Sequence, residues 1–287
     1  MKKMVSKTLM ACAVTAALGA FSSGVMAQTT GASFPNFTVT ETTQAGAGTV
    51  QSFSADKITG NYTEVITFSG NTFQASLLWN AGQFVTNDGT TPVPSQLSPT
   101  GGTASQYGLY ALYQANGTFS TSSSGVTTFN FASGSSPSLR VFLDPNSNTT
   151  FGAPGTGSGA WTTGNAGEDL LIATGAPISG QGTLDPTLST CTGGGGTAAG
   201  INCGSFGSST TFNLTGAGSS YFTAPNPFYN VSFQSGQLNN FSPTGTQTIN
   251  GSLDVVFNSQ VPEPASIALV GLGLAGLGLS RRRNKKA

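Results

Sequence analysis

Short segments in which apolar and polar residues alternate recur along most of the chain. This period of two is typical of strands with one buried face, because successive side chains of a strand point to opposite faces. Clusters of Gly, Pro, Asn and Ser separate the segments, and no long helical pattern lies between the two hydrophobic ends of the chain. The predicted strands span residues 62–68, 72–79, 126–131, 138–143, 210–214, 229–233 and 252–257. The pattern predicts an all-β fold, an antiparallel β-sandwich-like single domain.

The beginning of the chain departs from this pattern. Residues 1–7 form a short basic stretch, and residues 8–21 form an apolar run. Gly24-Val25-Met26-Ala27 then supplies small residues before a cleavage point. This arrangement is typical of a secretory signal peptide, so we expect signal peptidase to cleave after Ala27. A lipidated Cys12 is an alternative, but the apolar run continues well past that residue.

The end of the chain combines three parts within 27 residues. Pro262, Glu263 and Pro264 precede an uncharged apolar stretch at 265–279, which would extend about 23 Å as a helix. A bilayer core is about 30 Å thick, and long basic side chains and local thinning can make up such a shortfall. The stretch ends in a basic cluster that favours the cytoplasmic side, beginning with Arg281, Arg282 and Arg283. We therefore predict a transmembrane helix followed by a basic stop.

Taken together, the Val-Pro-Glu-Pro-Ala-Ser segment at 261–266, the glycine-rich apolar stretch and the three arginines resemble the PEP-CTERM sorting signal of Gram-negative bacteria. The resemblance implies that an exosortase, a membrane-embedded cysteine-type protease, recognises Pro262, Glu263 and Pro264. It also implies transient anchoring in the inner membrane and release to the cell surface or the extracellular matrix. The expected organisation is a signal peptide at 1–27, an extracellular β-rich domain at 28–260 and a sorting signal at 261–287.

Three segments of the body carry a second resemblance. Residues 107–113, 139–150 and 168–175 are similar to segments of the flocculation-associated PEP-CTERM proteins. That resemblance implies a protein that promotes cell aggregation, as floc or biofilm, in an exopolysaccharide matrix, and it transfers no catalytic residue. A carbohydrate-binding or calcium-dependent surface module is the alternative.

Charge and composition exclude several other functions. The body from residue 28 to 260 contains two basic and nine acidic residues, a net charge of −7, whereas a nucleic-acid partner requires a basic face. The chain contains no histidine, so it has no Ser-His-Asp or Cys-His system and no histidine metal ligand. We therefore expect no enzymatic activity and no cofactor.

Two cysteines remain once the signal peptide is removed. Cys191 and Cys203 would then lie in an oxidising compartment, where a disulfide between them is the expected state. Closing a loop of this length contributes about 3 kcal/mol by the chain-entropy estimate.

A calcium-loop spacing opens at Asp144, Asn146 and Asn148. The pattern then fails, because Thr149 stands where the turn glycine belongs and Gly155 where a bidentate glutamate would close the site. An Asp-Pro-Asn turn explains the segment better. Calcium remains the weaker interpretation, with no metal as the expectation.

The adjacent acids Glu168 and Asp169 are the remaining candidates for carboxylate chemistry. On a strand their side chains would point to opposite faces, which suits a paired acid-base mechanism poorly. We expect a structural role for them, or Asp169 as a further calcium ligand. A surface hydrolase is therefore the weakest of the functional alternatives.

Overall fold

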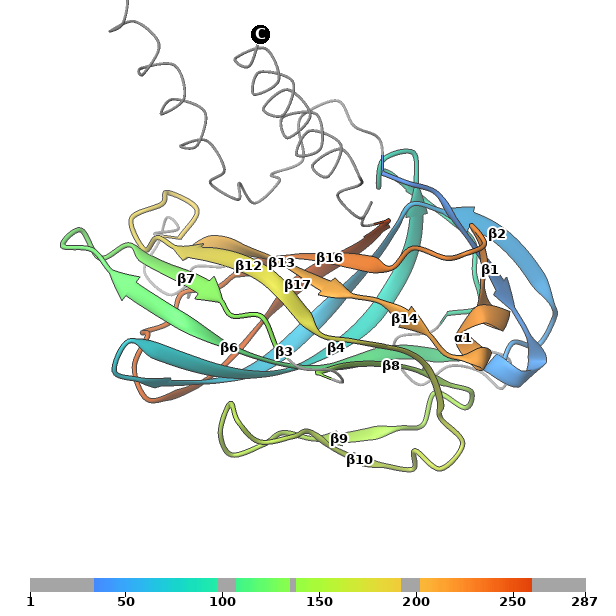
Figure 1. Ribbon diagram of the computed structural model, residues 1–287, viewed down its shortest axis with the longest axis horizontal. Coiled ribbons are helices and arrows are strands. Elements are labelled where there is room, and N and C mark those ends of the chain that lie inside the picture. The colour runs from blue at the N-terminus through green and yellow to red at the C-terminus, as the bar shows by residue number, and fades with distance from the viewer. Residues whose placement is uncertain (1–33, 98–106, 135–137, 192–201, 260–287) are drawn as a thin grey trace, which may run out of the picture. The chain divides into compact units, whose positions relative to one another are not determined.

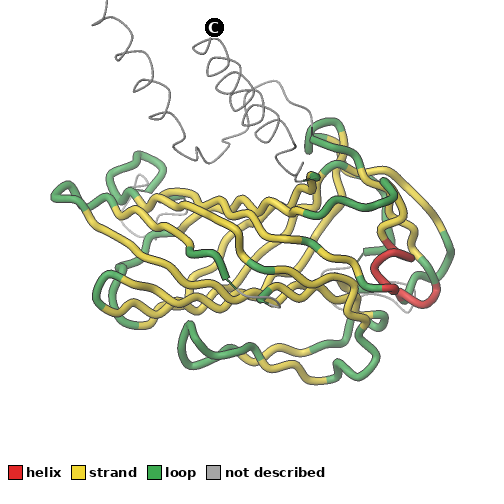
Figure 2. The backbone as a smooth tube through the Cα atoms, viewed as in Figure 1, coloured by secondary structure: helices red, strands yellow, loops and turns green. Residues whose placement is uncertain are grey.

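The computed structural model describes residues 34–97, 107–134, 138–191 and 202–259, and strands make up most of this part of the chain. The main sheet consists of β3 (Lys57–Ser69), β4 (Thr72–Thr86), β5 (Thr91–Pro92), β6 (Gly108–Thr121), β7 (Thr127–Phe131), β8 (Leu139–Asp144), β11 (Leu170–Gly175), β12 (Pro177–Leu184), β13 (Gly204–Thr211), β14 (Asn213–Leu214), β16 (Val231–Leu238) and β17 (Thr246–Asn258). A second sheet contains β15 (Phe222–Ala224), β1 (Phe37–Glu41) and β2 (Gln51–Ala55), and a separate hairpin contains β9 (Thr150–Gly152) and β10 (Thr162–Gly164). The described helices, the 3-10 helix η1 (Thr43–Ala45) and α1 (Gly216–Tyr221), lie at one end of the strands (Figure 2).

The main sheet closes on itself. Its strands follow one another as antiparallel neighbours in the order β3, β4, β6, β7, β12, β13, β16 and β17, and β17 pairs again with β3. Strands β7 and β8 pair with successive parts of β6 and together occupy one position in the sheet. In the same way, β11 and β12 share the next position, and β13 and β14 share the one after it. The result is an up-and-down arrangement of eight strand positions (Figure 1).

The predicted all-β, antiparallel fold is confirmed. Opposite parts of the closed sheet face each other across the core, as the layers of a sandwich do (Figure 1). Each of the seven predicted segments contributes to a strand of the main sheet. The domain boundaries at 27/28 and 260/261, and the sorting helix, lie outside the described residues and stay predictions.

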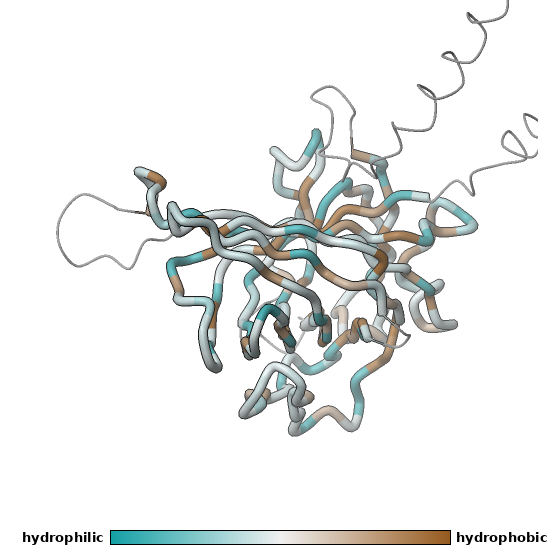
Figure 3. The backbone as a smooth tube through the Cα atoms, turned by 60° about the vertical axis from the view of Figure 1, so that its left-hand side comes forward, coloured by the Kyte–Doolittle hydropathy of each residue, from teal (hydrophilic) through white to brown (hydrophobic). Residues whose placement is uncertain are grey.

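The main core lies inside the closed sheet. Alternate residues of the long strands point inward, among them Leu77 and Trp79 of β4 and Ala111 of β6. Hydrophobic and hydrophilic residues therefore alternate along the strands (Figure 3). Strand β12 contributes glycines instead, because a Cβ atom at Gly180 would lie 3.0 Å from the ring of Phe131.

The small sheet covers one end of this core with aromatic rings. Phe37 of β1 packs edge-on against Phe257 of β17, with ring centroids 5.1 Å apart. Phe222 of β15 lies 5.5 Å from the same ring. Aromatic pairs in this geometry contribute about 0.5–1.5 kcal/mol each beyond the area that they bury, so the second sheet is held to the first by ring contacts.

A fully buried acid in this end cap has its hydrogen bonds satisfied. The carboxylate of Glu41 accepts a hydrogen bond from the Tyr107 hydroxyl at 2.9 Å and another from the backbone N–H of Gln96 at 2.8 Å. The hydroxyl oxygens of Tyr107 and Tyr221 lie 2.6 Å apart and form a hydrogen bond. Buried polar groups are tolerated when they are paired in this way.

A second buried acid, on the inward face of β3, lacks such partners. Glu64 is 7% exposed and occupies a position between the inward-facing Tyr62 and Ile66. Burial disfavours the charged carboxylate and raises the pKa of Glu64 from 4.5 to about 7. The interior of the sheet therefore contains one group whose charge changes near neutral pH.

The predicted disulfide is present. Cys191 and Cys203 are bonded to each other, and both are buried. The hydroxyl of Thr190 donates a hydrogen bond of 2.7 Å to the carbonyl of Asn202 across the same loop. The bond thus closes the connection between β12 and β13.

Removal of the disulfide should destabilise the protein by about 3 kcal/mol, because the unfolded chain gains the entropy of an open loop. The double variant Cys191→Ala/Cys203→Ala is compared with wild type by denaturant unfolding. Thr190→Ala, which keeps the disulfide and loses one exposed hydrogen bond, is the control and should cost at most about 1 kcal/mol. Equal stability of the double variant and wild type would contradict the prediction.

Glu64→Gln should stabilise the protein above neutral pH and leave it unchanged near pH 4.5. The folded protein holds a proton on Glu64 that the unfolded chain releases between pH 4.5 and about 7, so wild-type stability falls across this window. The full difference is about 3 kcal/mol, read from unfolding curves between pH 4 and 8. Tyr113→Phe in the same interior is the control, because burial raises the pKa of that hydroxyl and it stays neutral throughout. A pH-independent effect of Glu64→Gln would contradict the assignment.

Candidate functional site

The three residues of the calcium-loop spacing lie in a turn directly after β8. The carboxylate of Asp144 accepts hydrogen bonds from the backbone N–H of Asn146 at 3.2 Å and of Thr149 at 2.8 Å. These bonds fold the chain back over the aspartate, as Asp does in turns. Ser147 takes a left-handed conformation with φ 50° to complete the turn.

The acids Glu168 and Asp169 meet this turn from a distant part of the sequence. Both precede β11, which begins at Leu170, so the expectation that they lie on a strand and point to opposite faces is wrong. One carboxylate oxygen from each of Asp144, Glu168 and Asp169 lies within 4.8 Å of the others. We call these three residues the acidic cluster.

Neighbouring polar side chains orient the acidic cluster. The side-chain amide of Asn146 donates to Glu168 at 2.9 Å, and the hydroxyl of Thr149 donates to Asp169 at 2.9 Å. The hydroxyl of Tyr110 on β6 also donates to Asp169. Asn148 lies beside the Glu168 carboxylate as well, so all three residues of the predicted spacing gather at the cluster.

The electrostatics of the two later acids differ. The hydrogen bond from Asn146 lowers the pKa of Glu168, whereas partial burial raises the pKa of Asp169. Among the described residues, no basic side chain forms an ion pair with the acidic cluster. The ion pair that the described residues do form joins Lys57 to Asp254 on the outer face. Several carboxylate and amide oxygens close together, without a balancing base, form the donor set that Ca²⁺ prefers.

Sequence reasoning missed that the acidic cluster closes through Glu168 and Tyr110. The signal lay in strand pairing: Leu143 pairs with Leu170, which brings Asp144 beside Asp169, while β9 and β10 carry the intervening chain away as a hairpin (Figure 1). The apolar run at 170–173 could have been paired with the predicted strand at 138–143. The calcium-loop spacing instead places the closing ligand within the same loop, at Gly155.

The residues predicted for sorting lie outside the described residues: Ala27, Pro262, Glu263, Pro264, Arg281, Arg282 and Arg283. Within the described residues, no helix has both the length and the apolar character needed to cross a membrane.

Comparison with known families gives one finding for this tail. Residues 260–283 match the PEP-CTERM protein-sorting motif, and the matched range includes the Pro-Glu-Pro triplet and the three arginines. The chain carries a PEP-CTERM sorting motif. This motif implies that the protein is exported and sorted through the membrane to the cell surface of a Gram-negative bacterium by an exosortase. No curated protein and no solved structure matches the chain.

Proposed function

We propose that this protein promotes cell aggregation in an exopolysaccharide matrix after an exosortase has sorted it to the cell surface. The sorting motif at 260–283 carries the proposal, because it destines the body for the outside of the cell. Signal peptidase cleaves after Ala27 and the exosortase acts at Pro262-Glu263-Pro264, with a transient inner-membrane-anchored form between the two steps. The resemblance of the body to flocculation-associated proteins supplies the aggregating role.

The outer face of the closed sheet suits such a role chemically. Its exposed side chains on β12, β13 and β16 are hydroxyls and amides, namely Gln181, Thr183, Ser205, Ser235 and Gln237. Hydrogen-bonding groups of this kind match the hydroxyls of a polysaccharide. Because the face carries little charge, contacts made through it are weakly screened by salt.

Replacement of Pro262, Glu263 and Pro264 by alanine should keep the protein in the membrane and reduce aggregation. Intact mass and cell fractionation report processing and location, and settling of the culture reports aggregation. Wild-type protein should lack both termini and lie in the matrix. Lys285→Ala/Lys286→Ala, beyond the matched range, is the control and should behave as wild type.

The two parts of the proposal fail in different ways. Wild-type protein that retains its tail would contradict processing by an exosortase. Normal settling of cells in which the triplet variant stays in the membrane would contradict the aggregating role while leaving sorting intact.

We also propose that the protein has no enzymatic activity. The chain contains no histidine, and therefore no Ser-His-Asp or Cys-His system. Release of reducing ends from matrix polysaccharide by the purified protein, lost in both Glu168→Gln and Asp169→Asn, would instead support a surface hydrolase.

We infer a calcium-dependent surface module as the second candidate function. The observation that favours it is the convergence of three carboxylates within 4.8 Å, with Asn146 and Asn148 beside them. A bound Ca²⁺ would join the turn after β8 to the segment before β11 and so fix the hairpin of β9 and β10 on the surface.

Calcium should raise the melting temperature by about 4 °C when its concentration is about tenfold above Kd, because it binds only the folded site. Asp169→Asn should abolish the increase. Asp185→Asn removes an exposed acid outside the cluster, where the carboxylate bonds to Thr187, and should retain the response. An unchanged melting temperature of wild type at millimolar calcium would refute the calcium site.

A further inference from the structure

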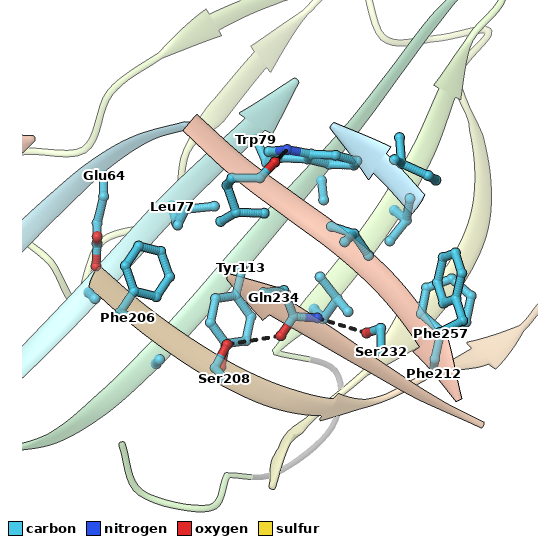
Figure 4. Close-up of a pocket in the computed structure, with 18 of the residues that line it drawn as sticks. Glu64, Leu77, Trp79, Tyr113, Phe206, Ser208, Phe212, Ser232, Gln234 and Phe257 are labelled. Atoms are coloured by element: carbon cyan, nitrogen blue, oxygen red, sulfur yellow. Dashed lines mark hydrogen bonds between the residues drawn. The ribbon is translucent and has the colours of Figure 1, made fainter. Parts of the chain in front are cut away.

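A cavity of about 50 Å³ lies inside the closed sheet (Figure 4). Its walls are largely aliphatic and aromatic, with side chains such as Leu77, Trp79, Phe212 and Phe257 around it. A water molecule requires about 10–15 Å³ of such space. The cavity therefore accommodates about three to five water-sized groups, the size of a very small organic molecule.

Glu64 lines this cavity without a hydrogen-bond partner. Its side chain lies at one end of the cavity lining, next to Phe206, and Phe212 and Phe257 lie at the other end (Figure 4). Among the described residues no hydrogen bond or ion pair reaches its carboxylate, and burial alone determines its altered pKa. Glu64 is 7% exposed, so most of its side chain is removed from water.

Three other polar side chains of the lining are joined to one another by hydrogen bonds. Gln234 accepts a hydrogen bond from Ser208 at 2.9 Å and donates to Ser232 at 2.8 Å (Figure 4). Thr210 and Ser232 are bonded at 2.7 Å. These four residues on β13 and β16 therefore form their hydrogen bonds without Glu64. The hydroxyl of Tyr113 lies near Ser208 without forming a hydrogen bond of acceptable geometry.

The body of the protein offers no counter-charge for Glu64. Between residues 28 and 260 the only basic residues are Lys57 and Arg140. Lys57 pairs with Asp254 at 2.8 Å, and the exposed Arg140 lies over the ring of Phe142, 5.9 Å from its centroid. A buried carboxylate without a paired charge is strongly disfavoured, so the charged form of Glu64 would need a cationic partner from another molecule.

We propose that the interior cavity binds a small primary ammonium compound, of about the size of ethylammonium, whose ammonium group pairs with Glu64. Charge-assisted hydrogen bonds from N–H groups to the carboxylate are the strong contacts of such a site. The ring of Phe206, which lines the cavity next to Glu64, supplies an aromatic surface that attracts a cation (Figure 4). The short alkyl part occupies the apolar remainder of the cavity.

Size and charge both contribute to selectivity in this proposal. A quaternary ion such as tetramethylammonium is bulkier than ethylammonium and has no N–H donor for the carboxylate. Ethanol has nearly the shape of ethylammonium but no charge for Glu64 to balance. The inference goes beyond the proposed role in aggregation, which involves the outer face.

The test measures the melting temperature of the protein purified from cells at pH 8 with ethylammonium chloride, against equal concentrations of sodium chloride, ethanol and tetramethylammonium chloride. We expect ethylammonium alone to raise it, by about 3 °C when the ligand is about fivefold above Kd. Glu64→Gln keeps the shape of the side chain and should abolish the increase. Asp254→Asn, which removes an acid from the outer face, should retain it.

A second measurement needs no variant. At pH 5 Glu64 is protonated, so the increase caused by ethylammonium should disappear in wild-type protein. The other titratable groups around it, Tyr62 and Tyr113, have pKa values raised by burial and are neutral at both pH values, and the adjacent β4 and β17 present Leu77 and Ile249.

Four results would overturn the proposal. They are no increase with ethylammonium up to about 100 mM, which is about a hundredfold above a Kd of 1 mM, an equal increase with ethanol, an equal increase in Glu64→Gln, and an increase that persists at pH 5. An ethanol response would show that the cavity takes neutral molecules through its apolar walls alone.

Discussion

The pairing of β4 with β6 is the constraint on which the rest of this structure depends. Nine residue pairs join these strands, and ten join β17 to β3, so the eight strand positions form a ring without a free edge between them. An unpaired sheet edge is a template for association, and many proteins protect it with lysine or other charges. Only 7% of the residues of this chain are charged. Closure instead pairs the backbone N–H and C=O groups that a sheet edge would leave without hydrogen bonds.

Closure also creates an inside, and the inside is where the sequence departs most from expectation. A closed sheet of this size is normally filled by side chains or holds one small ligand. Here Glu64 occupies a position where the alternation along β3 predicts an apolar residue, whereas Glu41, which is also buried, is hydrogen-bonded in the end cap. Local violations of such rules are expected at functional sites, and the contrast between the two acids distinguishes a structural group from an unsatisfied one.

Much of the fold could be predicted from alternation, and the strands that were missed have physical reasons. In β6 both faces are buried, since Ala111 points into the core and Leu112 lies in the outer cluster with Trp161, so no period of two appears. In β12 glycines stand at inward positions, because the rings of neighbouring strands occupy the space.

The two candidate sites also differed in how far the sequence predicted them. The sorting motif is a linear pattern and was identified from adjacent residues, while the acidic cluster depends on the pairing of Leu143 with Leu170. Its turn was evident from Asp144-Pro145-Asn146, but the acids that meet it are more than twenty residues away. Closure of the sheet likewise depends on pairing between strands far apart in the sequence, which the pattern within a short segment does not predict.

The position of β17 gives the fold a mechanical property. It is the last described strand before the sorting motif, and it pairs with β3 over residues 246–255 and with β16 over residues 253–258. A force applied to the chain just beyond Ser259 acts along this strand, parallel to both neighbours. Its hydrogen bonds are then loaded together in shear instead of one at a time as in unzipping, so the body resists traction applied along this strand.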